Sequence, residues 1–371
     1  MEFGNAYIRI CIHRIFDVGG ILLKVGVVSL KFSPGHMTHL RAYRELFKNL
    51  VDDVCLFIHP EYKKFMDDEE NVVFTDDINE IVNYKPDLVY IYNISTQNVS
   101  LLKKCEKQGI KTRYVLHEPQ GSLKELKEEG HNIVKTIGAW TVNANICRHC
   151  DKVILASETG RKNYEHYMIK DNKSYSVFPL IFCDEYEPDK TYVREYFAFI
   201  GGFMEVHGSK EFMKFVEYAL QRDKDIKFLI ATRVNVEAYL TSDLIKEAVR
   251  SGRMKIQAGR PMATEEINGF YRQSICVWNA YNRSTQSGVL PNALMQGAPV
   301  IVNNNGAAKE VMRDKAAGCF INMPPDNEQV YQSYLYIKEH LADMETSARE
   351  IFLQKYFYKS QLELARQVIL E

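Results

Sequence analysis

The chain has almost no net charge, because its 371 residues contain 47 Lys and Arg against 48 Asp and Glu. It lacks the basic excess that marks a nucleic-acid-binding protein, so we expect no nucleic-acid partner. It also lacks an apolar run near the ~20 residues that a membrane-spanning helix needs. Arg9, Arg14 and Asp17 fall where the apolar region of a signal peptide would lie. These absences favour a cytoplasmic protein and leave a place at the inner face of the cell membrane open.

Complete sets of metal ligands and a phosphate-binding P-loop are missing too. Cys147 and Cys150 form a Cys-x-x-Cys pair, but no second Cys or His pair lies at zinc-ligand spacing, so a tetrahedral site would be half built. No Gly-x4-Gly-Lys-Ser/Thr sequence is present. Eight cysteines in a chain of this length indicate reduced thiols rather than a disulfide framework. We therefore expect no bound metal and no P-loop.

At about 150 residues per domain, the length predicts two domains or three small ones. Short apolar runs alternate with helical stretches, which is typical of βαβ units and a parallel sheet. In the first half the expected strands are 23–30, 54–58, 88–92, 113–117, 152–156 and 175–178. In the second half they are 196–200, 226–231, 254–257, 275–278, 299–302 and 319–321. The fold class is therefore α/β, with two tandem Rossmann-like, doubly wound parallel-sheet domains.

A charged, turn-rich segment at 183–190 predicts a linker between the two alternations. We expect an N-terminal extension at 1–23, a first domain at 24–185 and a second at 191–345. Residues 1–50 carry seven Lys and Arg against three Asp and Glu, so a contact with an anionic membrane surface is left open. Parallel sheets bind ligands beyond the carboxyl ends of their strands, which predicts a site in the cleft between the domains.

The most informative stretch is 281–301, a polar loop that follows a buried strand and leads into a helix. We expect Ser287 and Gly288 in the first turn of that helix. Free N–H groups and the positive end of the helix dipole suit a diphosphate. A neutral loop capped by Ser or Thr would look the same, so both interpretations stay open on these residues alone.

Three stretches then stand out: Thr285-Gln-Ser-Gly-Val-Leu-Pro, Gly297-Ala-Pro-Val-Ile and Asn305-Gly-Ala-Ala-Lys-Glu310. Together they resemble the donor-binding signature of family 4 glycosyltransferases of GT-B fold, most of all the branch that reads A-T-Q-S-G-V. Asp151-Lys-Val-Ile-Leu-Ala-Ser157, Phe199-Ile-Gly-Gly202 and His117-Glu-Pro agree in order and spacing. The resemblance covers about residues 24–371.

The resemblance implies a metal-independent, retaining hexosyltransferase. It would move a sugar from a nucleotide-diphospho-sugar, held by the second domain, to a glycan or lipid-linked oligosaccharide held by the first. The product would belong to a surface polysaccharide such as a capsule, O-antigen or exopolysaccharide. No cofactor is implied beyond the donor substrate, and the last helix, 346–371, would pack back on the first domain. Two alternatives stay open: a nucleotide-sugar epimerase of the same fold, and a GT-B binding or scaffold protein that has lost catalysis.

By the same resemblance, two groups of loops form the site. The expected donor contacts are Gly201, Gly202, Arg260, Arg283, Thr285, Gln286, Ser287, Gly288 and Asn292. The chain departs from the family where Gly202 and His207 replace an Arg and a Lys, and where Ser284 and Asn292 replace two glutamates. Without a metal, protein groups must stabilise the leaving diphosphate. We expect His207, Lys210, Arg260 or Arg283 to replace the missing cations, with His207 as a catalytic residue.

His117 is the second expected catalytic residue, because it follows a strand and should face the cleft. The resemblance implies that it contacts the donor sugar near the reaction centre, although a lone histidine can equally be a satisfied structural group. Gly35, His36 and Glu118 are expected on the acceptor side. Gly35 would let a ligand approach the backbone closely, but a plain turn has the same sequence.

Overall fold

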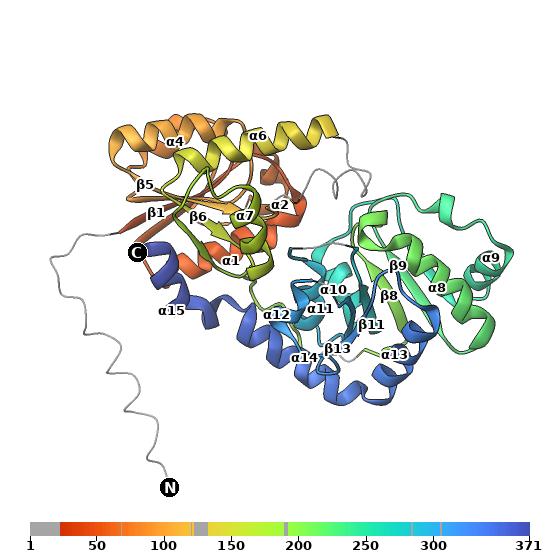
Figure 1. Ribbon diagram of the computed structural model, residues 1–371. Helices are drawn as coiled ribbons and strands as arrows, with labels where there is room; N and C mark the ends of the chain where they lie inside the picture. Colours follow the sequence, from red (N-terminus) through yellow and green to blue (C-terminus); the bar gives the residue numbers. More distant parts are fainter. Residues whose placement is uncertain are drawn as a thin grey trace, which may run out of the picture.

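The computed structural model describes residues 23–67, 69–119, 121, 133–188, 192–282, 285–304 and 306–371. Two α/β domains lie side by side (Figure 1), each built on a parallel sheet. The expectation of two tandem Rossmann-like domains is therefore confirmed. Apart from Leu23, the expected N-terminal extension lies outside the described residues.

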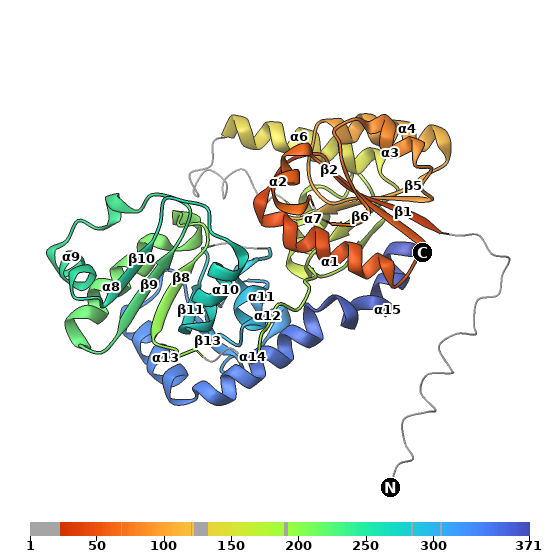
Figure 2. The same cartoon turned by 180° about the vertical axis from the view of Figure 1, so that it is seen from behind.

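The first domain contains a seven-stranded sheet in the order β3-β2-β1-β4-β5-β6-β7. Its strands are β1 (Lys24–Ser29), β2 (Asp53–Ile58), β3 (Val72–Phe74), β4 (Leu88–Ile91), β5 (Lys111–Leu116), β6 (Lys152–Leu155) and β7 (Tyr175–Val177). Its helices are α1 (Met37–Lys48), α2 (Lys63–Met66), α3 (Ile78–Asn83), α4 (Gln97–Gln108), α6 (Ile133–His149) and α7 (Glu158–Tyr167). Helices α4 and α6 cover one face and α1 the other (Figures 1 and 2), so the central strands are buried on both faces and read as continuous apolar runs.

The second domain contains a six-stranded sheet in the order β10-β9-β8-β11-β12-β13. Its strands are β8 (Tyr196–Ile200), β9 (Lys227–Ala231), β10 (Met254–Gln257), β11 (Ser274–Asn279), β12 (Val300–Asn303) and β13 (Gly318–Ile321). Its helices are α8 (Ser209–Arg222), α9 (Asp243–Arg250), α10 (Thr264–Arg272), α11 (Val289–Met295), α12 (Ala308–Val311), α13 (Asn327–Glu339) and α14 (Leu341–Lys355). One core packs α8, α9 and α13 on the sheet, and another packs α10, α11 and α14 on its opposite face.

The chain crosses between the domains twice, and the two crossings lie side by side. The N–H of Phe182 donates to the carbonyl oxygen of Tyr356 at 2.9 Å, and the N–H of Tyr358 donates to that of Phe182 at 3.1 Å. After the second crossing, α15 (Leu362–Ala365) and the π-helical turn Arg366–Leu370 lie on the first domain (Figure 1). The preceding helix, α14, still packs against α11, so the return begins after Lys355.

Candidate functional site

Two glycines fold the loop after β8 tightly. Gly201 has a φ of +114°, and a Cβ there would lie 3.2 Å from Cγ2 of Val289, the first residue of α11. Gly208 has a φ of +75°, and a Cβ there would lie 2.7 Å from the carbonyl oxygen of Ala280. The loops after β8 and β11 are therefore packed against each other at the carboxyl edge of the second sheet.

His207 lies in this loop and is held on two sides. Its Nδ1 donates to the carbonyl oxygen of Gly202 at 2.7 Å, and its ring stacks on Tyr281 with centroids 4.2 Å apart. Because a carbonyl oxygen only accepts, the neutral ring has its proton on Nδ1 and a lone pair on Nε2. Burial lowers the pKa of His207 below its usual range. Without a ligand, His207 thus supplies an acceptor and not the positive charge expected from the sequence.

The loop of residues 285–288, which we call the donor loop, leads into α11. Helix α11 begins at Val289 with Gly288 as its N-cap, so the expectation that Ser287 and Gly288 lie in the first turn is wrong. The Ser287 hydroxyl donates to Oδ1 of Asn279 at 2.7 Å and accepts the N–H of Val289 at 3.2 Å. A serine oxygen therefore takes one of the N–H groups that were expected to meet phosphate. Arg283 lies outside the described residues.

Two other expected donor contacts make bonds within the protein. The carbonyl oxygen of Thr285 accepts from the hydroxyl of Ser157 in the first domain at 2.5 Å. The Thr285 hydroxyl is buried and has no hydrogen-bond partner among the described residues. Nδ2 of Asn292 donates to the carbonyl oxygen of Gly288 at 2.7 Å, one helical turn earlier. A ligand that used the Asn292 N–H group would compete with this backbone contact.

His117 follows β5, and both of its ring nitrogens are hydrogen bonded. Nε2 donates to the carbonyl oxygen of Tyr92 at 2.6 Å, and Nδ1 accepts from Nε2 of Gln286 at 3.1 Å across the domain boundary. Burial, with smaller effects of His36 and His39, lowers the pKa of His117 to about 3. The imidazole is therefore neutral at pH 7 with its proton on Nε2, which suits a hydrogen-bonding role better than that of a base.

The expected acceptor residues lie beside His117. The ring of His36 stacks on it with centroids 5.2 Å apart, and burial lowers the pKa of His36 to about 4. Gly35 is exposed, and a Cβ there would meet nothing within 4 Å. Glu118 is also exposed. Burial raises the pKa of Tyr281 to about 12, and the Glu118 carboxylate acts in the same direction. Because Tyr281 stacks on His207, Glu118 on the acceptor side acts on the same ring that contacts His207.

Arg260 follows β10 and donates to both carboxylate oxygens of Glu266 at 2.6 and 2.9 Å. In the sheet, β9 lies between β10 and β8, so the loop that holds Arg260 is not the immediate neighbour of the loop that holds His207. Lys210 in the first turn of α8 and Arg233 after β9 are exposed and make no ion pair with a described residue. The sequence reasoning missed Arg233, although the rule that ligands bind beyond strand ends points to it.

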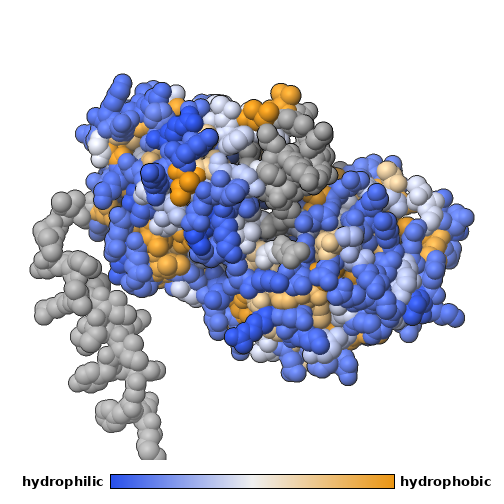
Figure 3. Space-filling model, viewed as in Figure 1, coloured by the Kyte–Doolittle hydropathy of each residue, from blue (hydrophilic) through white to orange (hydrophobic). Residues whose placement is uncertain are grey.

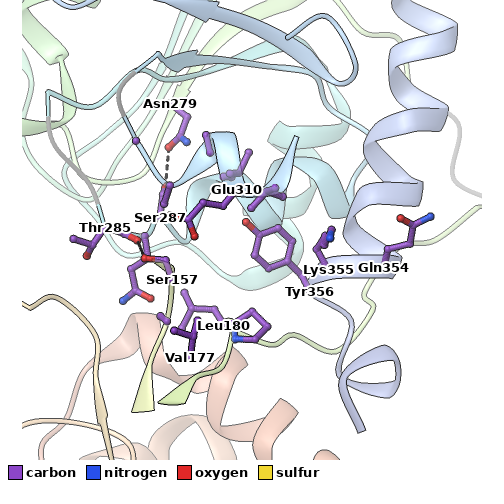
Figure 4. A pocket seen from close by; sticks show the side chains of 18 of the residues that line it. Ser157, Val177, Leu180, Asn279, Thr285, Ser287, Glu310, Gln354, Lys355 and Tyr356 are labelled. Carbon is purple, nitrogen blue, oxygen red and sulfur yellow. Dashed lines mark hydrogen bonds between the residues drawn. The ribbon is translucent and has the colours of Figure 1, made fainter. Parts of the chain in front are cut away.

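A pocket of about 390 Å³ lies between the domains beside the donor loop (Figure 4). Its walls come from the ends of β6 and β7, the loops after β11 and β12, and the end of α14. Ser157 and Thr285 lie on one wall, with Glu310 and Tyr356 on others (Figure 4). The pocket is therefore built by both domains.

Among the described residues, no group of three or more His, Cys, Asp or Glu could hold a metal ion. Cys147 and Cys150 are buried, and burial raises the pKa of Cys150 to about 12.

Across the described residues, no helix has the length and apolar character needed to cross a membrane. The face seen in Figure 3 is mostly hydrophilic, with apolar residues in small separate patches.

No protein-family model and no curated protein matches the chain. Solved structures do match it. HepE (Alr3699) of Anabaena in complex with UDP has a TM-score of 0.69 at 14% identity, over 94% of this chain and 100% of that one. Sucrose-phosphate synthase of Thermosynechococcus elongatus has a TM-score of 0.68 at 12% identity, over 94% of this chain and 99% of that one. A Listeria monocytogenes protein named as a UDP-N-acetylglucosamine 2-epimerase has a TM-score of 0.60 at 13% identity, over 94% of this chain and 96% of that one. Similarity at this identity establishes the fold, and the chain therefore has the GT-B fold.

Proposed function

We propose that the chain is a glycosyltransferase that uses a nucleotide-diphospho-sugar bound between its two domains. The observation that carries this proposal is the meeting of the loops after β8 and β11 at Gly201 and Val289, with Gln286 reaching His117 in the opposite domain. HepE binds UDP and UDP-glucose in crystals with the same fold, which supports a UDP-sugar as the first donor to test.

The diphosphate is assigned to the N–H group of Gly202 and to the beginning of α8, with positive charge from Lys210 in α8 and from Arg233 after β9. The N–H of Gly201 is excluded because it donates to the carbonyl oxygen of Ala231 at 2.9 Å. A diphosphate beside Nε2 of His207 would raise the pKa of that ring, because a neighbouring anion favours the charged form. His207 thus takes up a proton as the donor binds. Its charged N–H then stabilises the leaving diphosphate without a metal ion.

The reaction we propose transfers a hexose with retention. The bond from the anomeric carbon to the diphosphate oxygen breaks, and the acceptor oxygen forms its bond to that carbon on the same face. The proton of the acceptor hydroxyl passes to the leaving diphosphate oxygen. Neutral His117 offers its Nδ1 lone pair to a sugar hydroxyl in place of the Gln286 amide. Closure of the domains excludes water and so limits hydrolysis of the donor.

The acceptor is a glycan or lipid-linked oligosaccharide of a surface polysaccharide, bound on the side of Gly35, His36 and Glu118. Val134 and Ile137 of α6 are 80% and 44% exposed, which supports a peripheral contact with the cytoplasmic face of a membrane. Flotation with anionic phosphatidylglycerol vesicles tests this contact. Val134→Ser with Ile137→Ser should reduce flotation, and equal flotation of wild type and variant would contradict it.

A second candidate function is nucleotide-sugar epimerisation, because one match of the same fold is named for it. A third is binding without catalysis, because the two cations usual in the resembled family are replaced by Gly202 and His207. Thermal shift with UDP, GDP, CMP and their sugars, followed by transfer assays with soluble and lipid-linked acceptors, separates the three. Transfer only with an acceptor supports our proposal. A new sugar nucleotide without acceptor supports the epimerase, and binding without turnover supports the third.

Two variants test the placement of the donor. Gln286→Ala and His207→Ala should each weaken the binding of UDP-glucose several-fold, because each removes a polar group from the proposed site. Gln332→Ala, on an exposed position of α13 and away from the assigned contacts, is the control. Unchanged affinity in both site variants would contradict the placement, and no stabilisation by any nucleotide would contradict both enzyme proposals.

A further inference from the structure

A carboxylate of the second domain occupies the N-terminus of a helix in the first. Oε2 of Glu310 accepts the N–H of Glu158 at 2.8 Å, and Oε1 accepts the N–H of Thr159 at 2.7 Å. The Thr159 hydroxyl also donates to Oε1 at 2.5 Å. Glu310 is the last residue of the Asn305–Glu310 motif and lies in α12.

Helix α7 needs an external partner at this end. The first N–H groups of a helix have no acceptor within it, and its positive dipole end favours an anion. Ser157, the N-cap, accepts the N–H of Gly160 at 2.9 Å. This bond leaves Glu158 and Thr159 without a capping partner from their own domain. The cap of α7 is therefore completed by a residue some 150 positions later in the chain.

The same helix end is joined to the donor loop. The Ser157 hydroxyl donates to the carbonyl oxygen of Thr285, and the next residue, Gln286, reaches His117. These contacts and Glu310 all come from the loops after β11 and β12. Elsewhere, the two chain crossings are joined to each other by the backbone hydrogen bonds of Phe182.

We propose that Glu310 is a positioning residue whose carboxylate latches the second domain onto α7 and so holds the donor loop opposite His117. The inference rests on the proposed function for what the donor loop binds. The latch itself is a property of the two domains and can be measured without substrate.

Amide hydrogen exchange of the full chain tests the latch directly, because protection at Glu158 and Thr159 has no intrahelical source. Glu310→Gln keeps the size of the side chain and removes its charge, so both amides should exchange about tenfold faster or more. Thr159→Val should produce a smaller increase at Glu158. The control is Glu165→Gln, because Glu165 binds Arg161 and Tyr175 within the first domain.

A kinetic readout separates positioning from simple stabilisation. With UDP-glucose as donor, Glu310→Gln should lower kcat by about tenfold or more through misalignment of the two domains. The Kd for UDP should stay within about twofold, because the latch does not touch the proposed nucleotide contacts. Glu310→Asp, which keeps the charge, should recover part of kcat.

Unchanged exchange at Glu158 and Thr159 in Glu310→Gln would overturn the latch, and so would equal acceleration in Glu165→Gln. Accelerated exchange with an unchanged kcat would overturn the positioning role. If no variant and no wild-type protein binds or turns over a nucleotide sugar, the proposed function fails. The exchange data then still decide whether Glu310 holds the domains together.

Discussion

The rings of His207 and Tyr281 lie nearly parallel, 15° apart, with centroids separated by 4.2 Å. The stack covers part of the half-buried imidazole, and burial is the main reason that the pKa of His207 is lowered. The position that replaces a lysine of the resembled family therefore holds a neutral imidazole at pH 7, and under the proposed function it gains a charge when the donor binds. A lysine would be charged throughout the physiological pH range, whereas the charge of His207 depends on pH and on the ligand.

The binding of UDP-glucose should consequently depend on pH. The pKa of His207 lies below 6.5 in the free protein and should rise in the complex beside the diphosphate, so we expect proton uptake on binding. Affinity should increase as pH falls through the pKa of the complex and level off below that of the free ring. Isothermal titration between about pH 5 and pH 8 measures this dependence. His207→Gln should have a flat profile, and a flat wild-type profile would contradict the role of His207.

The pair formed by Gln286 and His117 gives a second prediction. Gln286→Glu places an anion beside Nδ1 and should raise the pKa of His117 from about 3 by roughly 1 to 3. Gln286→Met removes the amide without adding charge, so it should leave the pKa low. NMR titration of histidine-labelled protein reads both values. Equal pKa values in the two variants would show that the Gln286 side chain does not face Nδ1.

Glycine should be required at position 208 for two separable reasons. Gly252 has a φ of +77° and open space around a Cβ, whereas Gly208 combines +75° with a backbone oxygen at 2.7 Å. Gly252→Ala should cost about 1 kcal/mol of unfolding free energy, and Gly208→Ala about 1–3 kcal/mol more. Urea unfolding followed by the fluorescence of Trp278, which borders Gly208, measures the difference. Equal losses of unfolding free energy in the two variants would mean that the positive φ alone accounts for the cost at both positions.

Asn292 stands where the resembled family has a glutamate, so Asn292→Glu should strengthen a contact to a ribose hydroxyl. A charged acceptor gains about 1 kcal/mol over a neutral one, or roughly fivefold in affinity for UDP. Calorimetry with UDP and with 2′,3′-dideoxy-UDP, which lacks the ribose hydroxyls, tests this gain. A gain with both ligands would place the effect elsewhere than on the ribose.

Most of the fold could be predicted because strands buried on both faces are apolar without interruption. The expected strands end within two residues of the observed ones. The exception is β3, Val72–Phe74, which was not predicted. It has three half-buried residues at the edge of the sheet, too short a run to show a pattern.

The site could be predicted only where its residues follow the carboxyl ends of strands, because ligands of parallel sheets bind there. Residues that directly follow strands, such as His117 and Gly201, were identifiable from the sequence. The contact of Glu310 with Glu158 was not, because it joins residues 152 positions apart through the packing of two domains. The neutrality of His207 was equally hidden, since it depends on burial against Tyr281.

The packing of the C-terminal segment on the first domain also affects the order in which the two domains can fold during synthesis. Tyr358, Ala365 and Ile369 belong to the core of the first domain, and Nε of Arg113 donates to the carbonyl oxygen of Ile369 at 2.9 Å. Domains usually fold in the order of their synthesis. Here the domain made first lacks part of its core until residues 358–369 have been synthesised, whereas the core of the second extends no further along the described chain than Phe357. The later domain can therefore finish folding before the earlier one.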